Sequence, residues 1–362
     1  MTHANSTPLR VGLIGYGYAG KTFHAPLIQA TDGLVLSAVA SSDTAKVHRD
    51  LPQAEVYADT DQLIADTAID LVIIASPNAT HASLADAALV AGKHVVVDKP
   101  FTVDLTEARA LITRAERAGR LLSVFQNRRW DSDFLAVKQA IERDVAGTVR
   151  HFESHFDRYR PAVRARWREQ AIPGGGIWYD LGPHLIDQVL QLFGLPRHVS
   201  AKLAIQRPGG EVADWAHVLL DYGPTQVILH ASMLVAGGGT RFIVHGDHGS
   251  LLKSGADQQE SQLLAGMTPG APGWGADPDP LIVFDGESAA QRIDAPAGDY
   301  RHYYTGIRDA IGGTAPNPVP PAQALAVMAV LEAAIISNRE GCAIRLPLTP
   351  AECAAWQPRP EG

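Results

Sequence analysis

The stretch that most restricts the fold lies close to the start of the chain. "LRVGLIG" (9–15) is a short apolar run, and "GYGYAG" (15–20) continues it with the spacing G-x-G-x-x-G. Gly15 allows a tight turn, Gly17 lets the backbone approach a pyrophosphate, and Gly20 lets the next helix pack closely. The N-terminus of such a helix offers free N–H groups to phosphates. This context favours a dinucleotide-binding βαβ unit over a glycine-rich turn without a ligand.

Apolar, β-branched runs and helix-like stretches alternate through the first third of the chain. Runs of this length are typical of strands that are buried on both faces of a sheet. The expected strands are 9–15, 34–41, 70–77, 94–100 and 121–127. The expected helices are 22–31, 61–66, 81–91 and 104–118, the last capped by Thr102 or Asp104 with Glu107 placed for a capping box. The pattern predicts an α/β domain with a doubly wound parallel sheet over residues 1–126.

The pattern changes after Asn127. "TVRHFESHFDRY" (148–159) alternates like a half-exposed strand, with Phe152, Ser154 and Phe156 on one face. Further strands are expected at 198–205, 215–221, 225–233 and 241–245, and turn signals between them indicate a mostly antiparallel sheet. Helices are expected at 133–143, 183–193, 300–311 and 322–338, with a Gly- and Pro-rich loop over 265–280. Residues 127–362 are therefore expected to form a second α/β domain.

Composition limits the partners of the chain. A net charge of −8 and the absence of a basic stripe disfavour a nucleic-acid partner. The two cysteines, Cys342 and Cys353, make no disulfide framework and no zinc-finger spacing, so no metal is expected. No secretory signal is expected at the N-terminus, and no run of about 18 apolar residues predicts a membrane span. We expect a soluble, cytoplasmic protein.

The end of the second expected strand, "VASSDTAK" (39–46), bears on the choice of cofactor. NAD sites usually place an acidic residue here to bind the ribose 2′-hydroxyl. Ser41 and Ser42 with Lys46 instead suit a 2′-phosphate, which favours NADP over NAD. Asp43 is the contrary indication, because a shift of one residue would put a carboxylate at the ribose. An ordinary Ser/Asp helix cap is the alternative explanation for the whole stretch.

Two further strand ends carry polar residues, "ASPNATH" (75–81) and "VVVDKP" (95–100). Ligands in open α/β sheets lie beyond the carboxyl ends of the strands, so both stretches are candidates for a binding crevice. Asn78 can alternatively be an Asx turn and helix cap, and His81 a solvated helix residue. A partly buried lysine such as Lys99 can exchange a proton with a substrate hydroxyl. A surface lysine before a turn would be the favoured explanation in isolation, but the preceding dinucleotide-binding pattern favours a functional lysine.

"GGGIWYDLGPHLID" (174–187) places Asp180 and His184 four residues apart. Read alone, the two side chains fit a metal pair, a catalytic pair, or a helix cap with a surface histidine. A metal pair needs a third ligand, and no H-E-x-x-H or cysteine cluster supplies one. The helix is expected to begin at Pro183, because proline is tolerated in the first turn.

Together these motifs resemble one family. "GYGYAG", "SPNATH", "DKP", "FQNRRWD" and "RWREQAIPGGGIWYDLGPHLID" are similar in order and spacing, over nearly the whole chain, to the glucose-fructose oxidoreductase/inositol dehydrogenase/MocA family. "FHAPLI" and "HFDRYRP" resemble its NADP-preferring scyllo-inositol dehydrogenase branch. The resemblance implies a Rossmann domain and a C-terminal domain with a large open sheet. Since that sheet commonly forms the subunit interface, a homo-oligomer, dimer or tetramer, is expected.

The resemblance also implies roles for individual residues. Lys99 matches the catalytic lysine of a Glu-Lys-Pro motif, in which Asp98 is one methylene shorter than the family's glutamate. Asp180 and His184 match the aspartate and histidine of the second-domain helix. The cofactor-binding residues expected from the motifs and the resemblance are Gly15, Tyr16, Gly17, Ala19, Gly20, Ser41, Ser42, Lys46, Ser76, Pro77, Asn78, His81, Asp98, Lys99, Asn127, Trp167, Arg168 and Tyr300.

Hydride transfer needs a carbinol carbon held at the nicotinamide and a group that accepts the hydroxyl proton. His184 is the expected base, since an unperturbed imidazole titrates near ~6.5. Lys99 would donate a hydrogen bond to the developing alkoxide, and Asp180 would orient the imidazole or bind a neighbouring hydroxyl. The candidate contacts to a sugar or polyol are Arg158, Tyr159 and Arg166, which could equally be a solvated face.

Two other functions fit the same sequence. One is an NAD-dependent glycosidase, which would restore the redox state of its cofactor in each cycle. The other is a non-enzymatic, cofactor-binding regulator, which could dispense with the catalytic lysine. The presence of Lys99, Asp180 and His184 favours an enzyme. Inositols, aldoses and anhydro sugars all present a ring of hydroxyls, so the fold alone does not select among them.

Overall fold

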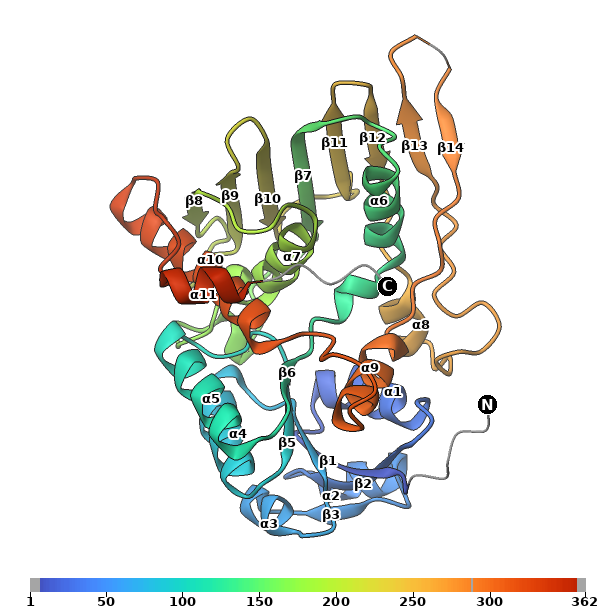
Figure 1. The fold of residues 1–362 in the computed structure, drawn as a ribbon, viewed down its shortest axis with the longest axis vertical. Coiled ribbons are helices and arrows are strands. Elements are labelled where there is room, and N and C mark those ends of the chain that lie inside the picture. The colour runs from blue at the N-terminus through green and yellow to red at the C-terminus, as the bar shows by residue number, and fades with distance from the viewer. Residues whose placement is uncertain (1–6, 288, 357–362) are drawn as a thin grey trace. The chain divides into compact units, whose positions relative to one another are not determined.

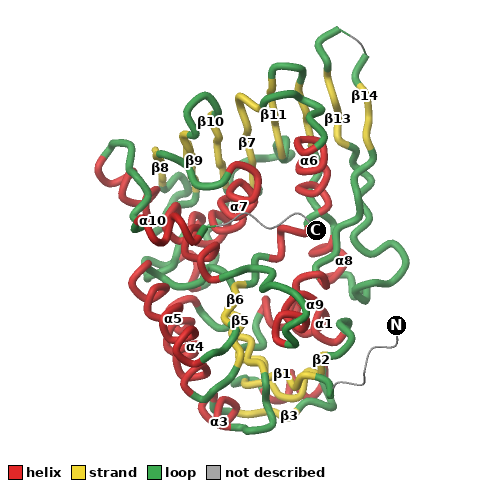
Figure 2. The backbone as a smooth tube through the Cα atoms, in the orientation of Figure 1, coloured by secondary structure: helices red, strands yellow, loops and turns green. Residues whose placement is uncertain are grey.

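The computed structural model describes residues 7–287 and 289–356, and the chain forms two compact units. Unit 1 contains the residues up to 127 together with 259–274 and 299–324. Unit 2 contains 128–258, 275–298 and the residues from 325 onward. The chain therefore passes between the units several times, and residue 127 marks only the first passage. Figure 1 labels the elements of both units, and Figure 2 separates helices from strands by colour.

Unit 1 is built on a six-stranded sheet in the order β3-β2-β1-β4-β5-β6, and its paired strands are all parallel. Its strands are β1 (Leu9–Ile14), β2 (Leu34–Ala40), β3 (Glu55–Tyr57), β4 (Leu71–Ile74), β5 (His94–Val97) and β6 (Leu122–Val124). The doubly wound parallel sheet is thus confirmed. Every residue of β4 is buried, as continuous apolar runs predict. The edge strand β3 was not expected, because it has three residues and none is buried.

Unit 1 also contains helices and helical turns, and Figure 2 shows helices in red. They are η1 (Gly20–His24), α1 (Ala25–Gln29), α2 (Thr44–Asp50), α3 (Thr60–Ala65), η2 (Asn78–Thr80), α4 (His81–Val90), α5 (Leu105–Ala118), α8 (Gln259–Leu264) and α9 (Arg301–Ile311). The single helix expected over 22–31 begins as the π-helical turn η1. Asp104, and not Thr102, caps α5 by accepting the Glu107 N–H. The largely polar helix α2 was not expected.

The strand order of unit 1 fixes where its loops gather. β1 lies between β2 and β4, so the strand order reverses direction there. Ligands of open α/β sheets bind beyond the carboxyl ends of the strands at such a switch point. The residues after β1, β4 and β5 all leave the sheet at that edge, because these strands are parallel neighbours. They include the glycine loop, Ser76–Asn78 and Asp98–Lys99.

Unit 2 contains an eight-stranded, mostly antiparallel sheet in the order β14-β13-β12-β11-β7-β10-β9-β8, in which β7 and β10 pair in parallel. Its strands are β7 (Val149–Asp157), β8 (His198–Ala204), β9 (Trp215–Asp221), β10 (Gln226–Ser232), β11 (Phe242–Gly246), β12 (Ser250–Lys253), β13 (Leu281–Phe284) and β14 (Gln291–Ile293). The expected mostly antiparallel sheet is confirmed. The sequence did not predict the three short strands β12, β13 and β14.

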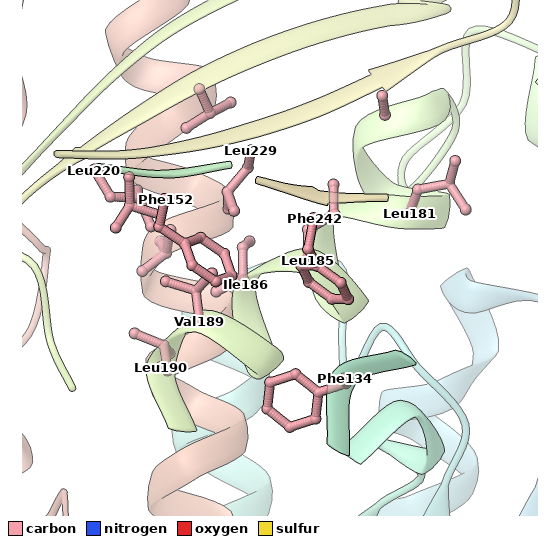
Figure 3. Close-up of a cluster of buried hydrophobic side chains, with 14 of the residues drawn as sticks. Phe134, Phe152, Leu181, Leu185, Ile186, Val189, Leu190, Leu220, Leu229 and Phe242 are labelled. Carbon is pink, nitrogen blue, oxygen red and sulfur yellow. The ribbon is translucent and has the colours of Figure 1, made fainter. Parts of the chain in front are cut away.

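One face of this sheet packs on helices to form the core of unit 2. Phe152 and Phe242 point from β7 and β11 toward Leu185 and Val189 of α7 (Ile177–Phe193), as Figure 3 shows. Phe134 of α6 (Ser132–Glu142) joins the same cluster. The remaining helices and turns are η3 (Asn127–Trp130), η4 (Trp167–Glu169), α10 (Pro321–Glu340) and α11 (Pro350–Ala355). The alternation of β7 therefore puts Phe152 in the core, on the face that the sequence predicted it to share with Ser154 and Phe156.

Helix α7 begins earlier than the sequence predicted. It starts at Ile177, so Pro183 lies inside the helix and not in its first turn. Proline supplies no backbone N–H at this position. Trp178 and Leu181 are buried in the core cluster, and this packing holds the first two turns in helical form. As a consequence, Asp180 and His184 both belong to one continuous helix.

Helix α10 is long and apolar enough to cross a membrane by length and composition alone. However, 67% of its apolar window is buried inside the protein, where Val330 and Leu331 are fully covered. Burial of this extent is what the core helix of a soluble protein shows.

Candidate active site

The glycine loop after β1 has the geometry that a dinucleotide needs. Gly15 has a φ of +96°, and a Cβ there would lie 2.6 Å from the Ala75 carbonyl oxygen. A Cβ on Gly20 would collide with the carbonyl oxygen of Gly15. At Gly17, by contrast, a Cβ would meet no protein atom within 4 Å. Gly15 and Gly20 are therefore required by the fold, while Gly17 leaves open space where a pyrophosphate can approach.

The residues after β2 that bear on the choice of cofactor differ in their hydrogen-bond partners. Asp43 caps α2, because its carboxylate accepts the Lys46 N–H at 3.0 Å. The Ser41 hydroxyl accepts the Asp43 N–H at 3.2 Å, and Ser42 is exposed. Lys46 donates from Nζ to the carbonyl oxygen of Tyr16 at 2.9 Å, which places its ammonium group beside the glycine loop. The stretch thus contains the helix cap that was the alternative explanation.

The loop after β4 is tied to the loop after β5 by a buried histidine. Nδ1 of His81 lies 2.9 Å from the Pro100 carbonyl oxygen, and Nε2 lies 3.0 Å from that of Ser76. Its side chain is 1% exposed, so the reading of His81 as a solvated helix residue is wrong. Burial lowers the pKa of His81, against the charge of Asp98 and the two carbonyl groups. Asn78 is buried at the start of η2 and does not cap α4, which begins at His81.

Asp98 and Lys99 leave the sheet at the end of β5. Asp98 is buried, and its Oδ1 accepts the Lys99 backbone N–H at 2.7 Å. Its other oxygen, Oδ2, lies 3.8 Å from Nε2 of His24. Burial alone would raise the pKa of Asp98, but the contact with His24 and the charges of His24, Lys99 and His81 hold it below its usual range. The two carboxylate oxygens of Asp98 therefore face the backbone N–H of Lys99 and the ring of His24.

Two other expected cofactor residues also lie in unit 1. Asn127 lies three residues after the end of β6 and is 4% exposed. Tyr300 is fully buried, with its ring centroid 6.3 Å from that of Phe23, and its backbone N–H donates to Oε1 of Gln259 at 2.7 Å. In this structure the side chain of Tyr300 therefore packs near Phe23 of η1.

In unit 2, Asp180 and His184 lie one turn apart on the same face of α7. The Asp180 carboxylate lies 3.5 Å from Nη1 of Arg158 and 3.5 Å from Nε of Arg168. His184 is 5% exposed, and its ring meets the edge of Phe156 with centroids 6.3 Å apart. The helix thus offers a carboxylate fixed by two guanidinium groups and, one turn later, an imidazole shielded from solvent.

A pocket of unit 2 opens at this carboxylate. Arg166, Arg168 and Asp180 line it together with Arg207 and Met233. Arg166 also pairs with Glu169 at 2.8 Å, and the guanidinium of Arg168 stacks over the Trp167 ring at 4.3 Å. Arg158 and Arg168 therefore approach Asp180, and Arg166 lines the same pocket.

Tyr159 stands apart from this group. Its residue is 60% exposed, and its backbone forms an isolated bridge with Leu234. Of the three candidate polyol contacts, Arg158 and Arg166 approach Asp180 or its pocket, whereas Tyr159 points into solvent in this structure.

Sequence reasoning did not single out His24 or Tyr304. Nδ1 of His24 lies 2.6 Å from the Tyr304 hydroxyl, although the two residues are 280 positions apart. His24 is the histidine of "FHAPLI", a motif used only for the family resemblance. Within residues 7–287 and 289–356, no group of three or more His, Cys, Asp or Glu side chains is arranged to hold a metal ion.

Comparisons with known proteins agree with this geometry. A family model described as the NAD-binding Rossmann fold of the Gfo/Idh/MocA oxidoreductase family matches residues 9–126. A second, described as the C-terminal alpha/beta domain of the same family, matches residues 138–346. Together the two models match more than half of the chain.

Curated proteins are similar over nearly their whole length. The uncharacterized oxidoreductase YdgJ of Escherichia coli K-12 is 51% identical, over 92% of this chain and 97% of that protein. The scyllo-inositol 2-dehydrogenase (NADP(+)) IolW of Bacillus subtilis 168 is 38% identical, over 93% of this chain and 96% of that protein. A solved oxidoreductase structure from Bacillus cereus is 31% identical with a TM-score of 0.85, covering 94% of this chain and 99% of that one.

Proposed function

This chain belongs to the glucose-fructose oxidoreductase/inositol dehydrogenase/MocA family, and we propose that it moves a hydride between a nicotinamide cofactor and a carbinol or carbonyl carbon of a sugar or cyclic polyol. Its oxidoreductase class and its nicotinamide-binding domain follow from the family. The observation that carries the proposed substrate class is the pair on α7, where Asp180 is held by two arginines one turn before the buried His184. Fixed carboxylate and guanidinium groups are suited to a ring of hydroxyls.

The residues of this chain would divide the work as follows. His184 accepts the proton of the reacting hydroxyl, because its imidazole is shielded from water and an imidazole nitrogen can take up and return a proton. Lys99 donates a hydrogen bond to the oxygen as negative charge develops there. Asp180 binds a neighbouring hydroxyl, since the two arginines already fix its carboxylate. The nicotinamide, when bound, supplies or accepts the hydride.

The glycine loop fits the cofactor, because the open space at Gly17 is where a pyrophosphate would lie. We propose NADP as the preferred form. Asp43 is occupied as the cap of α2, so its carboxylate is directed at the helix N-terminus. Ser42 is exposed and Lys46 brings an ammonium group to the loop, which suits a 2′-phosphate. The 38% identical relative is named as an NADP(+) enzyme, which supports this choice.

A cofactor-linked screen tests this function. Formation of NADPH or NADH is measured with a panel of inositols and aldoses, and consumption of NADPH or NADH is measured with their keto forms. The wild type is compared with Lys99→Ala and His184→Ala. Both variants should lose at least ~100-fold in kcat, the usual contribution of a positioned acid or base. The matched controls are Lys138→Ala and His248→Ala, whose side chains are 36% and 69% exposed. Wild-type activity in Lys99→Ala, or no turnover of the panel by the wild type, would overturn the proposal.

We also propose that the uncovered face of the unit 2 sheet contacts a second copy of the chain. Leu219, Ile228, Glu153 and Ile243 are register partners in a row across β9, β10, β7 and β11, and all are half-buried. Such a row favours association as a dimer or tetramer. Light scattering should give a mass of two or four chains, and Ile228→Lys should lower it; a single-chain mass for the wild type would contradict the proposal.

A cytoplasmic location completes the proposal. Cys342 and Cys353 are free and exposed, which suits a reducing compartment. Cell fractionation should recover the protein with the cytoplasmic proteins, and recovery outside the cytoplasm would contradict this.

A further inference from the structure

Three buried polar side chains, those of Tyr304, His24 and Asp98, lie in a row in unit 1, and Asp98 directly precedes Lys99. His24 ends η1, and its side chain is shielded from solvent. Its ring lies against Phe125, with centroids 4.4 Å apart. On one side, Nδ1 is 2.6 Å from the hydroxyl of Tyr304 on α9; on the other, Nε2 is 3.8 Å from Oδ2 of Asp98. His24 thus stands between a phenol and a carboxylate.

The two neighbours select one tautomer of the His24 ring. Burial holds the pKa of Tyr304 well above its usual value, so the phenol keeps its proton. If Nδ1 carried the only ring proton, Nε2 would turn a lone pair toward the Asp98 carboxylate in a buried site, which is repulsive. If Tyr304 donates to Nδ1, the proton sits on Nε2 and faces the carboxylate. The second arrangement lets the phenol donate to Nδ1 and turns the Nε2–H toward the carboxylate, whose Oδ2 lies 3.8 Å away.

Asp98 transmits this orientation to Lys99. Its Oδ1 accepts the Lys99 backbone N–H, while Oδ2 faces His24. An ionised carboxylate is the stronger acceptor for that N–H. His81 also acts on Asp98 through its charge, but its two ring nitrogens are directed at backbone carbonyl oxygens. His24 is therefore the imidazole that faces the free oxygen of the acid.

We propose that His24 and Tyr304 are positioning residues for Lys99. Tyr304 fixes the ring of His24, His24 orients the Asp98 carboxylate, and Asp98 holds the backbone from which the Lys99 side chain extends. This proposal rests on the function proposed above, in which Lys99 acts on the substrate oxygen. Neither positioning residue needs to touch the substrate.

The competing explanation is that His24 and Tyr304 simply fill the core. The chain offers a matched control, because Tyr303 is the preceding residue of the same helix and is also fully buried. Its hydroxyl donates to Oγ of Ser123 at 3.0 Å, and its ring also packs on Phe125. Tyr303→Phe and Tyr304→Phe each remove one buried hydroxyl from one helix, but only the second breaks the path to Asp98.

The first measurement uses the protein without cofactor. In ¹⁵N-histidine spectra, with His24 assigned by its loss in His24→Gln, the wild type should show the proton on Nε2. The Lys99 amide should exchange with solvent about tenfold faster in Tyr304→Phe and remain within twofold in Tyr303→Phe, as loss of one hydrogen bond implies. A proton found only on Nδ1, or equal exchange in the two variants, would overturn the proposal.

The second measurement follows turnover. Tyr304→Phe should lower kcat about tenfold with the KM for NADPH within twofold, and Tyr303→Phe should leave kcat within twofold. His24→Gln should retain more activity than His24→Ala, since an amide can accept from Tyr304 and donate to Asp98. Equal loss in both tyrosine variants would refute the positioning role. If the wild type turns over no polyol, the proposed function fails, while the amide exchange of Lys99 still decides whether His24 positions it.

Discussion

Alanine substitutions of Gly17 and Gly20 should separate the effect on cofactor binding from the effect on folding. In Gly17→Ala the new methyl group meets no protein atom within 4 Å, and Gly17 is not among the residues with positive φ. A Gly→Ala change in a compatible conformation adds about 0.4–1 kcal/mol to stability through the unfolded chain. The methyl group would instead occupy the space left for a pyrophosphate. We expect the Kd for NADPH to rise at least tenfold, which corresponds to about 1.4 kcal/mol.

Gly20→Ala should do the opposite. Its Cβ would collide with the carbonyl oxygen of Gly15, so the strand and helix must move apart. Overpacking of this kind typically costs about 1–3 kcal/mol. Thermal unfolding without cofactor should therefore show a lower Tm for Gly20→Ala and an unchanged or slightly higher Tm for Gly17→Ala. Fluorescence titration with NADPH gives the Kd. Unchanged affinity in Gly17→Ala, or a larger loss of Tm there than in Gly20→Ala, would refute the reasoning.

Three further changes have defined outcomes. Ser42→Asp should lower the NADPH-to-NADH ratio of kcat/KM at least tenfold without changing the Tm, and an unchanged ratio would remove Ser42 from cofactor choice. Asp187→Ala deprives buried Arg129 of contacts at 2.6 and 2.8 Å, so urea unfolding should show a loss of about 3–5 kcal/mol, and a loss under 1 kcal/mol would contradict this. Burial alone would lower the pKa of His155, but two β7 carboxylates raise it above the ordinary value. The ion pairs of His155 therefore stabilise the folded protein fully below about pH 6.5, and this stabilisation is lost as the pH rises through the raised pKa of His155. The Tm should fall between pH 6 and 8 in the wild type, and His155→Gln should make that fall smaller.

The sequence predicted the parts of the fold in which local pattern and burial agree. β4 and β5 are covered on both faces and read as unbroken apolar runs. β3 was missed, because half-exposed edge residues carry no such pattern. The start of α7 was misplaced, since Pro183 is typical of a first turn. Burial of Trp178 and Leu181 extends the helix toward its N-terminus instead.

The residues of the candidate site were likewise predictable only where the reason for them is local in the sequence. The glycine loop was predictable, because each glycine has a local backbone reason. His81 was misjudged, since its ring bonds to the Pro100 carbonyl oxygen, 19 positions away. The His24–Tyr304 contact joins the end of η1 to α9, and no periodicity links residues that far apart. Sequence spacing thus identified the residues at strand ends but not the buried groups that hold them.

Transfer of a substrate hydrogen to the cofactor tests the central claim most directly. Inositols and aldoses deuterated at carbon are incubated with the wild type and NADP⁺, and the reduced cofactor is examined by mass spectrometry. Direct hydride transfer predicts that NADPH accumulates with one deuterium and that the polyol becomes a ketone or lactone. Release of the deuterium to water, or hydrolysis of a glycoside without net NADPH, would contradict the account.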